Sequence, residues 1–96
     1  MVIQVRDLVP GADTAQQGDV LFPHLQAAMA TGEPFVVSFA NIQSATSSFV
    51  NAAFARLLKD YAFADIRKQM RVVQSTRQIN DMIRTRLSRV SIEVAA

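Results

Sequence analysis

The sequence predicts a small α/β domain, a sandwich in which a mostly parallel sheet of three to four strands packs with about three helices. The chain has 96 residues, enough for one hydrophobic core and too few for two, so residues 1–96 are expected to form a single domain. Half of the residues are hydrophobic and 19% are charged, a composition typical of a folded chain. Short apolar runs alternate three times with segments of helical periodicity, and this order indicates parallel strands joined by right-handed crossovers.

The first strand is predicted at residues 2–6, where apolar and polar side chains alternate. A first helix follows, and Gly32 gives its stop signal. If Asp19 is the N-cap, Pro23 lies in the first turn, where its missing N–H costs no intrahelical bond. A start near Thr14 would place Pro23 inside the helix and predict a kink there.

The next strand is predicted at residues 35–39, a nearly continuous apolar run of the kind found in a central strand covered on both faces. A polar stretch at residues 41–48 leads to a second helix over residues 49–61, where apolar residues recur at two adjacent positions in each of three turns. Residues 70–73 predict a third strand.

A third helix follows this strand. Ser75 and Gln78 have the spacing of a capping box, in which the two side chains satisfy free backbone N–H groups. The apolar face of this helix is formed by Ile79, Met82, Ile83, Leu87 and Val90.

The net charge of +2 is unevenly distributed along the chain. Residues 1–49 hold one basic and four acidic residues, a net charge of −3, whereas residues 50–96 hold nine basic and four acidic residues, a net charge of +5. The basic half could bind an acidic protein partner or a nucleic acid. A solvated helix face of mixed charge would explain the same composition without any partner.

The amino-acid composition also indicates where in the cell the protein is expected to be located. The absence of cysteine excludes a disulfide framework, a thiol nucleophile and a thiolate metal site, and favours an intracellular protein. No apolar stretch approaches the roughly 20 residues that span a bilayer. Arg6 and Asp7 stand where a signal peptide would need its apolar region, so we expect a soluble chain without a membrane segment or a cleaved leader.

The sequence contains no recognisable catalytic or metal-binding pattern. His24 is the single histidine, and no serine or carboxylate stands at a spacing typical of a catalytic pair. The acidic residues are scattered without a metal-ligand motif, and the three glycines do not form a phosphate-binding loop. We therefore expect a protein that is not an enzyme and that uses no metal and no cofactor.

The most informative segment is the hydroxyl-rich stretch at residues 44–49, between the central strand and the second helix. Ligands and partners of open α/β sheets are met beyond the carboxyl ends of the strands, and a helix N-terminus favours an anion. A phosphate on Ser47 would be well placed there. Thr46 or Ser47 can equally serve as the helix cap, and the two roles are compatible.

Residues 32–42 (Gly-Glu-Pro-Phe-Val-Val-Ser-Phe-Ala-Asn-Ile) and residues 46–54 (Thr-Ser-Ser-Phe-Val-Asn-Ala-Ala-Phe) resemble the strand–loop–helix signature of the STAS-like domains of unknown function. The helix before this signature and the strand after it also fit, so the resemblance covers about residues 14–90. These domains are in turn similar to the STAS domains of anti-sigma-factor antagonists and of sulfate transporters.

In the antagonists, a serine within Asp-Ser-x-Gly at this helix start is phosphorylated by a kinase that doubles as the anti-sigma factor. Ser47 aligns with that serine, which makes it a candidate phosphoacceptor. Thr46 stands where the antagonists carry Asp, Phe49 where they carry Gly, and Ser38 where Asp is common at the end of the strand.

The resemblance implies a bacterial, cytoplasmic signalling module without enzymatic activity, which binds a protein partner such as a histidine-kinase-type ATPase or an anti-sigma-like regulator. Phe49 is expected in the core, because it shares a helix face with Ala53 and Leu57. The expected contact residues are Ser44, Thr46, Ser47, Ser48 and Asn51.

Two alternatives stay open. One is a nucleic-acid-binding accessory protein, whose basic residues would be Arg67, Lys68, Arg71, Arg77, Arg84, Arg86 and Arg89. Against it, no helix-turn-helix pattern precedes the last helix, Asp81 stands where it would pair with Arg77, and aromatic residues for stacking are missing from the basic region. The other is a homodimer that protects an edge of the small sheet.

Overall fold

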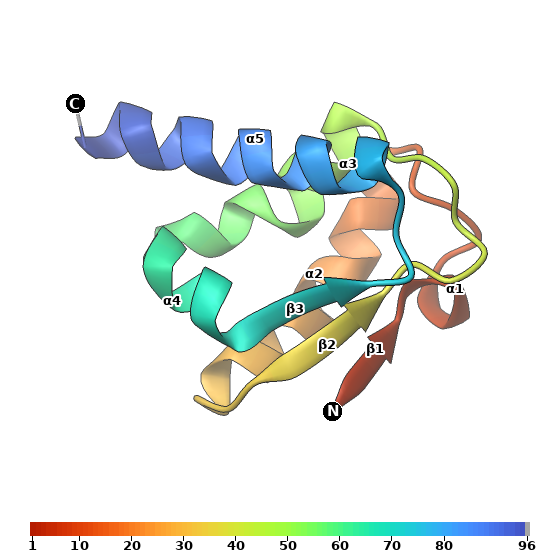
Figure 1. The fold of residues 1–96 in the computed structure, drawn as a ribbon, viewed down its shortest axis with the longest axis horizontal. Coiled ribbons are helices and arrows are strands. Elements are labelled where there is room, and N and C mark those ends of the chain that lie inside the picture. Colours follow the sequence, from red (N-terminus) through yellow and green to blue (C-terminus); the bar gives the residue numbers. More distant parts are fainter. Residues whose placement is uncertain (96) are drawn as a thin grey trace.

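Three parallel strands form one sheet in the computed structural model, which describes residues 1–95, with side chains to residue 88. The strands are β1 (Val2–Gln4), β2 (Phe35–Ser38) and β3 (Met70–Val73), in the order β1-β2-β3 (Figure 1). The predicted α/β class, the parallel sheet and the central position of the second strand are therefore confirmed. Arg89 and Val90, named in the sequence analysis, lie outside the described side chains.

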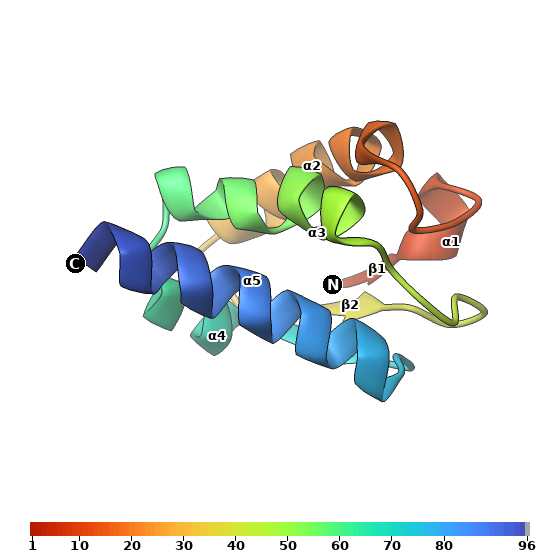
Figure 2. The same ribbon diagram turned by 90° about the horizontal axis from the view of Figure 1, so that it is seen from above.

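The helices α2, α3 and α5 lie beside one another, and α3 lies between the other two and contacts both (Figure 2). The described residues hold five α-helices, two more than expected, and one 3-10 helix. Their bounds are α1 (Val5–Leu8), α2 (Ala15–Ala30), α3 (Ser47–Ala53), η1 (the 3-10 helix, Ala55–Lys59), α4 (Phe63–Gln69) and α5 (Arg77–Ala95). No helix in the described part of the chain is long and apolar enough to cross a membrane.

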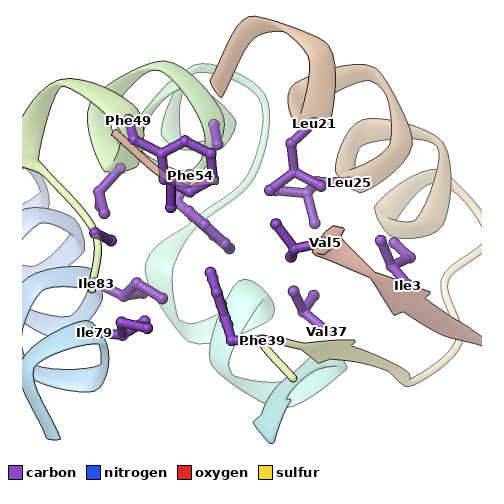
Figure 3. Packing of buried hydrophobic residues seen from close by; sticks show 14 of the residues in the cluster. Ile3, Val5, Leu21, Leu25, Val37, Phe39, Phe49, Phe54, Ile79 and Ile83 are labelled. Carbon is purple, nitrogen blue, oxygen red and sulfur yellow. The ribbon is translucent and has the colours of Figure 1, made fainter. Parts of the chain in front are cut away.

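The two faces of the sheet differ in burial. Ile3 and its register partner Val37 are buried, whereas on the opposite face Val2 is 58% exposed and its neighbour Val36 is half-buried. Residues 35–39 were expected to be covered on both faces. All of them are buried except Val36, because its side chain lies on the face opposite to that of Val37, which points toward α2 and α3 (Figure 3), and therefore points away from these helices.

Three aromatic rings form the centre of the core. The ring of Phe54 lies 6.2 Å from that of Phe39 and 6.4 Å from that of Phe49, measured between centroids, and all three side chains are fully buried. Figure 3 shows Val37 and Phe39 pointing from the sheet toward α2 and α3. Phe49 is thus a core residue, as its spacing predicted.

The N-terminal elements differ from the prediction in their bounds. The strand expected at residues 2–6 ends at Gln4, because the chain turns there into α1. The N-cap of α2 is Thr14, so the alternative with Pro23 inside the helix is the correct one. Thr14 Oγ1 accepts a hydrogen bond from the Gln17 backbone N–H, and Gln17 Oε1 accepts one from that of Thr14. This capping box sets the start of the helix at Thr14, while the carboxylate of Asp19, the other candidate cap, pairs with Arg56 instead.

Two further predictions need correction. The helix expected over residues 49–61 is interrupted at Phe54 and continues as the tighter η1, whose i→i+3 bonds include one from Leu57 N to Phe54 O. The capping box at Ser75 is not formed. Thr76 Oγ1 accepts from the Ile79 backbone N–H, and Ser75 Oγ donates to Oδ1 of Asn80, one turn into α5.

Close contact between α2 and α3 depends on Gly18. A Cβ atom at this position would lie 2.6 Å from the carbonyl oxygen of Phe49 and 2.7 Å from Cβ of Ala52, both shorter than van der Waals contact. The absence of a side chain therefore allows the two helix backbones to approach each other.

We expect Gly18→Ala to lower the free energy of unfolding by about 1–3 kcal/mol, although alanine is the better helix former. The reason is that α3 must move away from α2 to accommodate the methyl group. Urea-induced unfolding measures this change. Gln26→Ala, at an exposed position of the same helix, is the control and should stay within about 0.5 kcal/mol of the wild type. A Gly18→Ala protein as stable as the wild type would contradict the contact.

Candidate functional site

The loop between β2 and α3 begins at the carboxyl end of the central strand, the position at which α/β sheets meet ligands and partners. It turns tightly, because the Ile42 backbone N–H donates to Phe39 O over 2.9 Å and Asn41 adopts a left-handed conformation with φ of 67°, which asparagine tolerates. The side chains of Ile42 and Ala45 are buried. The loop is therefore anchored to the core at two points.

Residues at the start of α5 fix the same loop through its backbone. The carboxamide of Gln78 accepts a hydrogen bond from the Ala45 N–H and donates one to the Ala45 carbonyl oxygen, each over 2.9 Å. Thr76 Oγ1 donates to the carbonyl oxygen of Gln43 over 3.1 Å. Gln78, predicted as half of a capping box, thus serves as a clamp between two elements that are distant in sequence.

Thr46 fixes the other end of the loop and caps α3. Its Oγ1 accepts from the Phe49 backbone N–H and donates to the carbonyl oxygen of Asp13, and its own N–H donates to the carbonyl oxygen of Ala12. The structure therefore assigns the cap to Thr46 and not to Ser47. The single hydroxyl proton of Thr46 is already used within the fold.

Other predicted contact residues lie around this cap. Ser44, Ser48 and Asn51 are exposed, and Ser47, the first residue of α3, is half-buried. The side chains of these four residues make no hydrogen bond within the described part of the chain. Ser47 and Asn51 share a helix face, one turn apart. Together with Thr46, these residues form what we call the α3 surface: Ser44, Thr46, Ser47, Ser48 and Asn51.

The basic residues proposed for nucleic-acid contact do not all lie on one surface. Arg67, Arg71 and Arg84 line a common hollow, whereas Arg77 lies at the start of α5. Arg86 is half-buried, and its Nε atom has no hydrogen-bond partner among the described residues.

Among those residues, the single ion pair within 4.0 Å joins Arg56 to Asp19. The pair expected between Arg77 and Asp81 is therefore not formed. His24 is exposed on α2, and no three side chains of His, Asp or Glu within the described ranges lie close enough to hold a metal ion.

The chain is similar to one known protein family. A family model described as a STAS-like domain of unknown function matches residues 17–80, which are 64 of the 96 residues and include β2, α3 and the Gln78 clamp. Neither the curated proteins nor the solved structures contained a match.

We expect Gln78→Leu to lower the free energy of unfolding by about 1–3 kcal/mol, because the N–H and carbonyl groups of Ala45 lose their partner. The amide proton of Ala45 should also exchange faster with solvent. Urea melts and amide hydrogen exchange measure the two effects. Thr85→Leu, at an exposed position of the same helix, is the matched control. Equal stability and equal exchange in the two variants would show that Gln78 does not hold the loop.

Proposed function

The chain belongs to this family of STAS-like domains, and on that premise we propose that it is a non-enzymatic regulatory module that binds a protein partner through the α3 surface. The proposal rests on one short segment in which some residues hold the backbone in place and their neighbours present exposed side chains. Ala45 and Thr46 direct their hydrogen bonds inward and fix the backbone, while Ser44, Ser48 and Asn51 are exposed. A surface held in one conformation loses little entropy when a partner binds.

The kind of partner is inferred from the similarity of these domains to the STAS domains of anti-sigma-factor antagonists. This similarity supports, as the partner, a histidine-kinase-type ATPase or an anti-sigma-like regulator in a cytoplasmic, bacterial signalling system. Ser47 is the proposed phosphoacceptor, since it aligns with the phosphorylated serine of the antagonists. A phosphate there would add about −1.5 to −2 charges at neutral pH, to a surface whose five side chains are all uncharged.

Site-specific photo-crosslinking in the cell that produces the protein tests the surface. A photoreactive residue at position 44 or 48 should capture one and the same protein, and a photoreactive residue at position 26, which is exposed on α2, should not. Capture from position 26 with none from 44 or 48 would overturn the proposal.

Ser47 variants then test the switch against the purified partner. Ser47→Ala should bind as the wild type does and unfold within about 0.5 kcal/mol of it, because Thr46 provides the cap. Ser47→Asp should fold but bind more weakly, since its charge imitates the phosphate. Thermal melts and calorimetric titration separate stability from affinity. Unchanged affinity of Ser47→Asp would exclude Ser47 as a switch. It would not affect the docking surface, which the crosslinks test separately.

A further inference from the structure

A second surface lies between α4, β3 and α5, and it shares no residue with the α3 surface. A hollow of about 580 Å³ opens there. Its apolar lining comes from three elements. Ile66, Ile83 and Leu87 are buried, and Phe63 and Val72 are half-buried. Covering an apolar lining that solvent reaches is favourable, because it removes apolar surface from water.

The rim of this hollow is basic. Arg67, Arg71 and Arg84, one from each of α4, β3 and α5, line it, and all three are exposed. Within the part of the chain whose side chains are described, no acidic residue is among the lining residues. The guanidinium of Arg67 lies 5.9 Å from the centroid of the Phe63 ring, which places a cation beside the apolar lining.

The basic rim continues into a second hollow of about 580 Å³. Arg67 and Arg71 line both hollows, and Lys68 adds a further cation to the second one. Positive charge therefore extends from α5 across β3 toward the exposed side chain of Val2. The two adjoining hollows form a depression that four cations line, which makes its local potential positive.

We propose that this depression, the α4–α5 groove, binds a segment of a protein partner in which acidic side chains alternate with apolar ones. The apolar side chains would cover Val72 and Phe63 and remove their exposed area from water. The carboxylates would meet the guanidinium groups, whose planar donors suit bidentate pairing. An apolar centre with an arginine-rich rim is also the usual composition of a protein–protein interface.

A nucleic acid fits this groove less well. Its phosphates would reach the arginines but would leave the apolar lining without a contact. Base stacking needs exposed aromatic rings, but of the aromatic residues that line the two hollows in the described part of the chain, Phe63 is half-buried and Phe35 is buried. The groove and its charge therefore favour the acidic, apolar peptide.

The test uses a short fluorescein-labelled synthetic peptide in which glutamate and leucine alternate in pairs, and fluorescence anisotropy with the full chain. Two companion peptides isolate the chemistry, one with lysine in place of glutamate and one with serine in place of leucine. The glutamate–leucine peptide should bind. The lysine peptide and the serine peptide should bind at least about tenfold more weakly, because each lacks one of the two contributions.

Variants of the protein locate the binding. Arg71→Glu and Arg84→Glu should each weaken the glutamate–leucine peptide about tenfold or more. Arg77→Glu makes the same change of net charge outside the groove and should leave the affinity within about twofold. Circular dichroism establishes that each variant is folded, and two groove variants on different elements guard against failure of one to fold.

Several results would overturn the proposal. Equal binding of the lysine and glutamate peptides would indicate unspecific apolar adhesion. An equal loss in Arg77→Glu would indicate an effect of net charge alone. Tighter binding of duplex DNA than of the peptide, lost in Arg71→Glu and Arg84→Glu, would assign the groove to nucleic acid. Since this groove and the α3 surface share no residue, these results leave the proposed function unaffected.

Discussion

The close approach of α2 to α3 at Gly18 positions the rest of the structure. With the backbone of α3 almost in contact with α2, Phe49, Val50 and Ala53 fall inside the core. Their burial stabilises the position of α3, and α3 in turn contacts α5 and η1. A side chain at residue 18 would displace α3, and the α3 surface with it, away from the end of the central strand.

Hydrogen bonds from distant parts of the chain complete this arrangement. Gln78 holds Ala45 on one side, and the backbone of residues 12–13 holds Thr46 on the other. The fold thereby presents two surfaces of different chemistry. The α3 surface is polar and uncharged, whereas the α4–α5 groove is apolar at its centre and basic at its rim. The two surfaces therefore differ in the kind of ligand that would fit them.

Local signals predicted the strands and the core well, because short apolar runs such as residues 35–39 and the stop at Gly32 depend on neighbours in sequence. Helix α4 was missed, since Ile66 is its one buried side chain and gives no periodicity. The cap of α2 stayed open between Asp19 and Thr14, and that of α5 was assigned to Ser75 instead of Thr76, because several hydroxyl or carboxylate side chains near each start could serve. The Gln78 clamp and the convergence of three arginines join residues on separate elements, and a single sequence contains no signal for such contacts.

The loop between β2 and α3 is held in one conformation by its hydrogen bonds to α5 and to residues 12–13. Backbone order parameters from ¹⁵N relaxation of the free protein measure this rigidity. We expect values of about 0.85 for residues 42–48, the level of a rigid backbone. Values below about 0.6 in this segment, while α2 and α3 stay rigid, would contradict it.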